Sequence, residues 1–132
     1  MLSSRLHLHW ALRHSSTLED RPRYTPTSAF ATFPWPQPSA DRRERIGSLA
    51  AELIERRQQI CVERGIGLTA LYNQVDDGAW EDLVRLHAQL DAAVAGAYGW
   101  PREAAAVPLD GNARLAALNT RIARGETMYA PF

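Results

Sequence analysis

Lysine is absent from this chain of 132 residues, and all fifteen of its basic side chains are arginine. Folding does not require such a bias, but arginine pairs bidentately with phosphate and guanine, so the composition is compatible with binding to DNA. Fifteen acidic residues balance the arginines and leave no net charge. The chain therefore has no global field that would attract nucleic acid or an anionic membrane.

Cysteine is scarce, and long apolar runs and a secretion signal are lacking. Cys61 is the only cysteine, which excludes an internal disulfide framework and fits a reducing compartment. No apolar run approaches the roughly 20 residues of a membrane-spanning helix. The first residues contain neither the apolar segment nor the cleavage site of a signal peptide. We therefore expect a cytoplasmic protein that does not contact membranes.

Sequence motifs for catalysis are missing too. Neither standard glycine-rich phosphate-binding motif occurs. His7, His9 and His14 lie close together, but no cysteine or carboxylate pair near them completes a metal site, so surface or partner-facing histidines are favoured. His87 precedes Asp91 by four residues, a spacing that permits a hydrogen bond and favours a core-edge histidine over a general base. We predict no catalytic and no metal-binding residue.

The first third of the chain carries the excess of positive charge. Residues 1–45 hold seven arginines and four acidic residues, so the remainder carries the compensating negative charge. Within this part, Arg21-Pro22-Arg23-Tyr24 places two arginines beside an aromatic residue, and such a segment can reach phosphates or base edges. The alternative to DNA contact is an ordinary solvated loop, and composition alone favours the loop.

Residues 1–38 differ in pattern from the rest of the chain. Two patterns overlap at their start: the strand-like alternation of Leu6, Leu8, Trp10 and Leu12, and the helical spacing of Leu2, Leu6 and Trp10. Residues 24–33, rich in threonine and aromatics, are predicted to be a short extended stretch, which Pro26 restricts to a sheet edge. The prolines at positions 34, 36 and 38 then predict an extended linker and a boundary.

Residues 39–124 show the spacing of amphipathic helices. A first helix is predicted to begin at a cap on Ser39 or Asp41 and to end at the glycines at positions 65 and 67, with Cys61 as a small core residue on its inward face. Thr69 is then predicted to cap a short turn through residues 70–73.

Asp76 or Asp77 is predicted to cap a second long helix, which ends at Gly99-Trp100-Pro101. Its apolar stripe consists of Trp80, Leu83, Val84, Leu86, Leu90, Val94 and Ala97, and the acidic residues at positions 81 and 82 suit its dipole. A last helix over residues 112–124 precedes a loose tail, residues 125–132. The sequence thus predicts a mainly α fold: a small antiparallel helical bundle preceded by an extended, Pro-rich arm with at most short β segments.

Several phrases of this sequence, in this order, resemble the C-terminal end of type IIL (MmeI-like) restriction-modification enzymes and related class I S-adenosylmethionine-dependent DNA methyltransferases. The likeness covers residues 3–124. The phrases are Arg23-Tyr24-Thr25, Ala31-Thr32-Phe33-Pro34-Trp35-Pro36, Leu68-Thr69-Ala70-Leu71-Tyr72-Asn73, Leu86-His87, Leu90-Asp91-Ala92-Ala93-Val94, Ala97-Tyr98-Gly99-Trp100-Pro101 and Leu115-Ala116-Ala117-Leu118-Asn119.

The resemblance implies that residues 1–38 are the end of a target-recognition domain with its linker, and residues 39–124 a helical C-terminal domain. It implies duplex DNA as a partner, together with the methyltransferase domain of a parent or split enzyme. The residues expected to face DNA are Arg13, Glu19, Arg21, Arg23 and Tyr24.

The family's cofactor-binding glycine motif and its Asn-Pro-Pro-aromatic catalytic motif do not occur in this chain. We therefore expect that this chain binds no cofactor and is not an enzyme. S-adenosylmethionine is the cofactor of the full-length enzymes of the family that it resembles. We expect either a remnant of a longer gene, which is favoured, or a separately translated subunit.

A second functional hypothesis is a stand-alone helical module for protein–protein interaction. Its docking surface would consist of exposed aromatic residues of the arm, namely Trp10, Phe30, Phe33 and Trp35.

Overall fold

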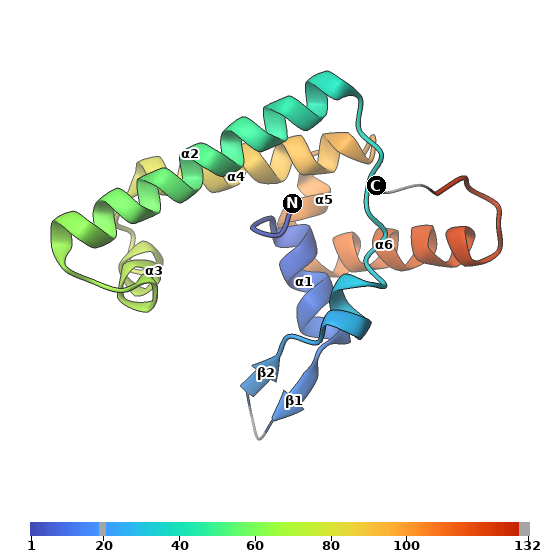
Figure 1. Ribbon diagram of the computed structural model, residues 1–132, viewed down its shortest axis with the longest axis horizontal. Coiled ribbons are helices and arrows are strands. Elements are labelled where there is room, and N and C mark those ends of the chain that lie inside the picture. Colours follow the sequence, from blue (N-terminus) through green and yellow to red (C-terminus); the bar gives the residue numbers. More distant parts are fainter. Residues whose placement is uncertain (19–20, 130–132) are drawn as a thin grey trace.

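The computed structural model of the chain describes residues 1–18 and 21–129, and helices dominate it (Figure 1). Two long antiparallel helices, α2 and α4, lie side by side, and α3 connects them at one end. Near the other end α1, α5 and α6 pack together, and β1 and β2 project from this part (Figure 1). The elements are α1 (Arg5–His14), β1 (Ser16–Leu18), β2 (Arg21–Arg23), the π-helical turn η1 (Pro26–Phe30), α2 (Ala40–Arg64), α3 (Leu68–Asp76), α4 (Glu81–Ala97), α5 (Glu103–Ala106) and α6 (Pro108–Ala123).

The predicted mainly α fold is confirmed. β1 and β2 form a two-stranded antiparallel sheet of three residues each, so β structure in the described residues is as short as expected. No helix in residues 1–18 and 21–129 is both long enough and apolar enough to cross a membrane.

Helix α2 begins and ends where local signals predict. Ser39 occupies the N-cap position, although its side chain makes no capping hydrogen bond. Gly65 adopts a left-handed conformation (φ 62°) that favours glycine, and its N–H bonds back to the last turn. Ile46, Leu49, Leu53 and Ile60 are buried at helical spacing.

The predicted start of α4 is wrong, and so is the predicted capping role of Thr69. Thr69 is the second residue of α3, which continues to Asp76, so neither Asp76 nor Asp77 caps α4. Trp80 precedes α4 instead, in a left-handed conformation (φ 59°). Its indole N–H donates to the side-chain Oε1 of Gln74 over 2.9 Å, and two arginines of α2 lie 5.8 and 5.4 Å from its ring centre. These tertiary contacts hold a conformation that local capping preferences would not select.

The rest of α4 follows its predicted pattern. The acidic residues at positions 81 and 82 lie in the first turn, and Gly99 (φ 73°) follows the last turn in the left-handed region. Leu83, Leu86, Leu90 and Val94 are buried, whereas Val84 is exposed.

The N-terminal segment is helical where its pattern was ambiguous. Ser4 caps α1, since its Oγ accepts from the His7 N–H over 3.4 Å. Leu6 and Trp10 are buried on one face, and Leu8 and Leu12 are exposed on the other. The prediction that residues 24–33 are extended is wrong for η1, where the Ala31 N–H donates to the Pro26 carbonyl over 2.8 Å. Proline tolerates the first helical position, because it has no N–H that would need a partner there.

One hydrophobic core joins both parts of the chain. Leu6, Trp10 and Phe33 belong to the same buried cluster as the inward residues of α2, α4 and α6. Gly111 of α6 lies at a close approach: a Cβ placed there would lie 2.8 Å from the Ala104 carbonyl oxygen and 2.8 Å from Leu6 Cδ2. The described part of residues 1–38 is therefore packed into the helical body rather than extended away from it, apart from β1 and β2.

The C-terminal part also differs from expectation. α6 begins at Pro108, four residues before the predicted Asn112, because proline is well suited to the first turn. The segment predicted as a loose tail is irregular and Met128 is 94% exposed, but Tyr129 ties it to the body. The Tyr129 hydroxyl accepts from the Trp35 N–H over 3.0 Å and donates to the Phe33 carbonyl over 3.2 Å. Residues 130–132 lie outside the described part of the chain.

Candidate nucleic-acid interface

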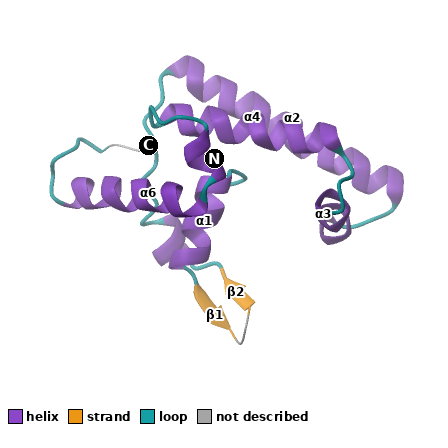
Figure 2. Ribbon diagram, turned by 180° about the vertical axis from the view of Figure 1, so that it is seen from behind, coloured by secondary structure: helices purple, strands orange, loops and turns teal. Residues whose placement is uncertain are grey.

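The hairpin of β1 and β2 projects from the helical body at the C-terminal end of α1 (Figure 2). Its register pairs Ser16 with Arg23, Thr17 with Pro22 and Leu18 with Arg21. A two-stranded ribbon that stands clear of the body is one of the shapes that fit the major groove of DNA.

Polar hydrogen bonds fix the base of the hairpin. The Thr25 hydroxyl donates to the Arg23 carbonyl over 3.1 Å and accepts from the Ser16 N–H over 3.3 Å. Ser28 of η1 donates to the His14 carbonyl over 2.6 Å, which ties η1 to the end of α1. Both strands therefore leave the body from an anchored position.

Tyr24 connects the hairpin to the core. Its hydroxyl lies 3.1 Å from His7 Nε2, and His7 is itself 3% exposed and packed against the rings of Phe33 and Trp35. Burial, followed by the charge of the chain's amino terminus, lowers the pKa of His7. A neutral His7 is the state that suits this aromatic surrounding.

The structure brings Arg13, Arg21, Arg23 and Tyr24 to the hairpin and its base. Arg13 is exposed in the last turn of α1, and Arg23 is exposed at the body end of β2. Neither forms an ion pair with a residue of the described ranges. Tyr24 is 45% exposed although its hydroxyl is engaged. Arg21 is placed by its backbone at the far end of β2.

Glu19 is the fifth residue expected at this interface, and it lies outside the described residues.

Two exposed guanidinium groups at the base of a projecting ribbon, with no ion-pair partner among the described residues, are suited to oxyanion recognition. Arginine offers several donors in a planar fork that matches phosphate and the guanine edge. Tyr24 presents a ring that a sugar or a base can contact. The arrangement can position phosphates.

The histidines outside this interface have structural surroundings. His87 Nε2 lies 2.7 Å from the Tyr72 hydroxyl, and burial, then the charges of Arg57 and Arg5, lower the pKa of His87. The predicted His87–Asp91 contact is therefore replaced by a bond between α3 and α4, while Asp91 accepts from the Arg5 N–H over 2.8 Å.

The histidines of α1 face different surroundings. His7 is buried against aromatic rings, whereas His14 stacks on Trp10 with ring centres 3.9 Å apart. Among the described residues no group of three or more potential metal ligands comes together. Cys61 is half-buried against the core as a free thiol.

The docking surface of the alternative hypothesis is not formed as expected. Trp10 is 2% exposed and Phe33 is fully buried, because α1 is a helix whose inward face meets the residues after η1. Trp35 is half-buried, and the ring of Phe30, which is 37% exposed, lies tilted against it with ring centres 5.0 Å apart. Trp10 and Phe33 therefore stabilise the interior of the protein, and only Phe30 of the four remains exposed.

Sequence reasoning missed Thr25, Ser28 and His7 as anchors of the hairpin. Thr25 and Ser28 flank Pro26, and hydroxyl residues beside a proline are a general signal for a turn with side-chain hydrogen bonds to the backbone. The partner of Tyr24 could not be found in the same way, since His7 is 17 residues away.

The protein is thus a mainly α-helical domain with a small projecting β-hairpin. Comparisons with protein-family models, with curated proteins and with solved structures find no match to this chain.

Proposed function

We propose that this protein is a non-catalytic DNA-contacting module of a DNA adenine methyltransferase or restriction-modification enzyme. The hairpin and its base contact duplex DNA, and the helical body supports the hairpin. S-adenosylmethionine chemistry is supplied by a methyltransferase domain with which this module acts, in a parent or split enzyme.

The observation that carries the proposal is the anchored, basic hairpin. Arg13 and Arg23 lie exposed at its base without ion-pair partners among the described residues. Arginines that are not neutralised by carboxylates release counterions when they meet phosphate, which favours binding at low salt. The bonds of Thr25 and Tyr24 limit the ordering that the hairpin would need on binding.

The resemblance of the sequence supports the choice of enzyme class. Its phrases run in the family's order from the hairpin region, through Phe33-Pro34-Trp35-Pro36, into the helices. Phe33 and the residues after it connect the hairpin-bearing segment to α2, so the resembling phrases fall at the junction of two parts of one core.

A salt titration with labelled duplex DNA tests the proposal. Fluorescence anisotropy of a short duplex at about 50 mM salt should give weak binding, with a Kd of about 10⁻⁴ to 10⁻⁶ M, and raising salt to about 200 mM should weaken it steeply. Binding that is absent at low salt, or that does not respond to salt, contradicts DNA contact by arginines. Tight, sequence-selective binding by the chain alone contradicts the role of a supporting module.

A methylation assay tests the proposal that the chain is not catalytic. The purified chain, mixed with duplex DNA and labelled S-adenosylmethionine, should incorporate no methyl groups into the DNA. Clear incorporation would show that the chain is an enzyme and would overturn this part of the proposal. An adjacent reading frame that encodes a methyltransferase domain would support the proposed partner.

A further inference from the structure

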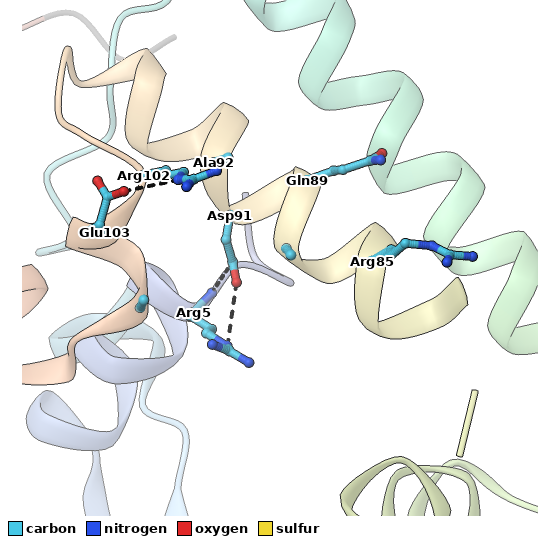
Figure 3. Close-up of a pocket in the computed structure, with 9 residues that line it drawn as sticks. Arg5, Arg85, Gln89, Asp91, Ala92, Arg102 and Glu103 are labelled. Atoms are coloured by element: carbon cyan, nitrogen blue, oxygen red, sulfur yellow. Dashed lines mark hydrogen bonds and ion pairs between the residues drawn. The ribbon is translucent and has the colours of Figure 1, made fainter. Parts of the chain in front are cut away.

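A cavity of about 540 Å³ opens between the N-terminal end of α1, the outer face of α4 and α5 (Figure 3). Its size falls within the range of about 300–1,000 Å³ that is typical of small-molecule sites. The hairpin is formed by other residues and does not line it.

Asp91, in the wall of the cavity, is already paired with Arg5. Asp91 is 6% exposed and is bound by Arg5 twice, through the backbone N–H at 2.8 Å and through the side-chain Nε at 3.5 Å. Burial raises the pKa of Asp91, and the N–H and the guanidinium of Arg5 act against that rise. The Asp91 charge is therefore already engaged inside the wall of the cavity (Figure 3).

At the rim, Arg102 pairs with Glu103 at 3.0 Å, and both side chains are largely exposed. Exposed pairs of this kind contribute little free energy, so Arg102 can exchange Glu103 for another anion at small cost. Arg85 has no ion-pair or hydrogen-bond partner among the residues that the structure describes. Three guanidinium groups thus face two carboxylates, and Arg85 is left as the uncompensated charge.

The floor of the cavity is apolar. Ala88 and Ala92 follow Arg85 on the same outer face of α4, at spacings of three and seven residues, and Ala106 of α5 lies across from them. Small side chains here leave room over the helix. The cavity therefore combines a cationic rim with a flat hydrocarbon surface.

We propose that this cavity binds a small organic anion, whose carboxylate or phosphate group pairs with Arg85 and Arg102 while its apolar body lies over Ala88 and Ala92. Arginine suits both oxyanions because its fork matches their paired oxygens. In Figure 3 the exposed Arg85 side chain points away from Arg102 and toward α2, and it has no ion-pair partner among the described residues. To pair with a bound anion it turns toward the cavity that it lines. This inference is independent of the proposed DNA contact.

Calorimetric titrations with four probes test the proposal. They separate the pairing of the oxyanion with the arginines from the apolar contact with the floor of the cavity. Benzoate and phenyl phosphate carry an oxyanion on an apolar ring, whereas acetate and inorganic phosphate carry the oxyanion almost alone. The ring-bearing probes should bind with a Kd of about 1 mM or below, and about tenfold more tightly than their small counterparts. A preference for phenyl phosphate over benzoate identifies a phosphorylated ligand, and the reverse preference identifies a carboxylic acid.

Two variants change the site without opening the core. Arg85→Gln removes the uncompensated charge, and Ala88→Leu fills the floor at an exposed position; each should weaken benzoate binding about tenfold. Arg43→Gln removes an exposed arginine of α2 that does not line the cavity, so binding should be unchanged. Circular dichroism confirms that each variant is folded.

Several results would overturn the proposal. These are no binding of the ring-bearing probes, binding that either cavity variant leaves unchanged, or equal weakening by Arg43→Gln. Displacement of benzoate by a short DNA duplex would assign these arginines to the DNA backbone and would also contradict a small-ligand site.

Discussion

The Tyr24 hydroxyl lies 3.1 Å from Nε2 of His7, and this contact joins the hairpin to the buried aromatic cluster of α1. His7 Nδ1 has no hydrogen-bond partner among the described residues, so Tyr24 provides the one bond assigned to this imidazole ring. The contact links a residue expected at the DNA interface to the hydrophobic core.

Tyr24→Phe should therefore destabilise both the fold and the hairpin. The substitution keeps the ring but leaves both nitrogens of a buried His7 unpaired, which we expect to lower the free energy of unfolding by about 1–2 kcal/mol. Urea denaturation gives this free energy, and hydrogen exchange should show faster exchange of the hairpin amides. Leu12→Ala, at an exposed position of α1, is the control and should have little effect. Unchanged stability and exchange in Tyr24→Phe would show that the contact does not anchor the hairpin.

Two glycines in helices should respond in opposite directions to alanine. Gly111→Ala places a methyl group 2.8 Å from both the Ala104 carbonyl oxygen and Leu6 Cδ2. We expect a loss of about 1–3 kcal/mol in the free energy of unfolding, because α6 must move away from α1 and α5. Gly47→Ala in α2 meets nothing within 4 Å and should stabilise the protein by about 0.5–1 kcal/mol. The same sign for both variants in thermal denaturation would contradict this packing.

The stability of the protein should fall on mild acidification. Burial lowers the pKa of His7, His9, His14 and His87 in the folded protein. Below the unfolded pKa of about 6.5, the unfolded chain binds protons that the folded protein does not. The free energy of unfolding therefore decreases as the pH falls. The stability that the neutral histidines contribute is fully present above the unfolded pKa of about 6.5, and it is lost as the pH falls through their lowered pKa values in the folded protein.

Urea denaturation at about pH 7.5 and about pH 5.5 measures this dependence. His87→Gln keeps a side chain that can reach the Tyr72 hydroxyl but cannot become charged, so it should reduce the decrease between the two pH values. A free energy of unfolding that rises on acidification over this range would refute the assignment of neutral, buried histidines.

Local sequence signals predicted the ends of helices where glycine is required. Gly65 and Gly99 both adopt the left-handed conformation that was expected of them. Helical spacing likewise identified most of the buried residues of α2 and α4, because the periodicity of a helix is a property of neighbouring residues. The exceptions are Ile54 and Val84, which share the apolar spacing but are exposed. The mainly α class follows from the same patterns.

Long-range contacts account for the predictions that failed. Two acidic residues at positions 76 and 77 suggest a helix cap, but Trp80 is fixed by Gln74 and by arginines of α2 and takes that position. The tail was expected to be loose, but the Tyr129 hydroxyl contacts the backbone at Phe33 and Trp35, more than 90 residues earlier. Neither partner is indicated by residues nearby in sequence.

The candidate interface was predictable in part. Its arginines and Tyr24 stood out as a basic segment with an aromatic residue, and the structure brings them to one hairpin and its base. Of the aromatic residues offered as a docking surface, Trp10 and Phe33 are buried, because α1 is a helix that turns Trp10 into the core. A period of two and a helical period cannot be separated over so short a segment.

Contact between the hairpin base and DNA phosphates is best tested by comparing two charge-matched double variants in the anisotropy assay. Arg13→Gln with Arg23→Gln removes the exposed arginines at the hairpin, and Arg43→Gln with Arg45→Gln removes two exposed arginines of α2. The hairpin variant should lose at least about tenfold in affinity for duplex DNA, and the slope of log K against log salt should fall by about 2. The α2 variant should retain most of the affinity and the slope of the parent. Equal losses in the two variants, or an unchanged slope in the hairpin variant, would contradict this contact.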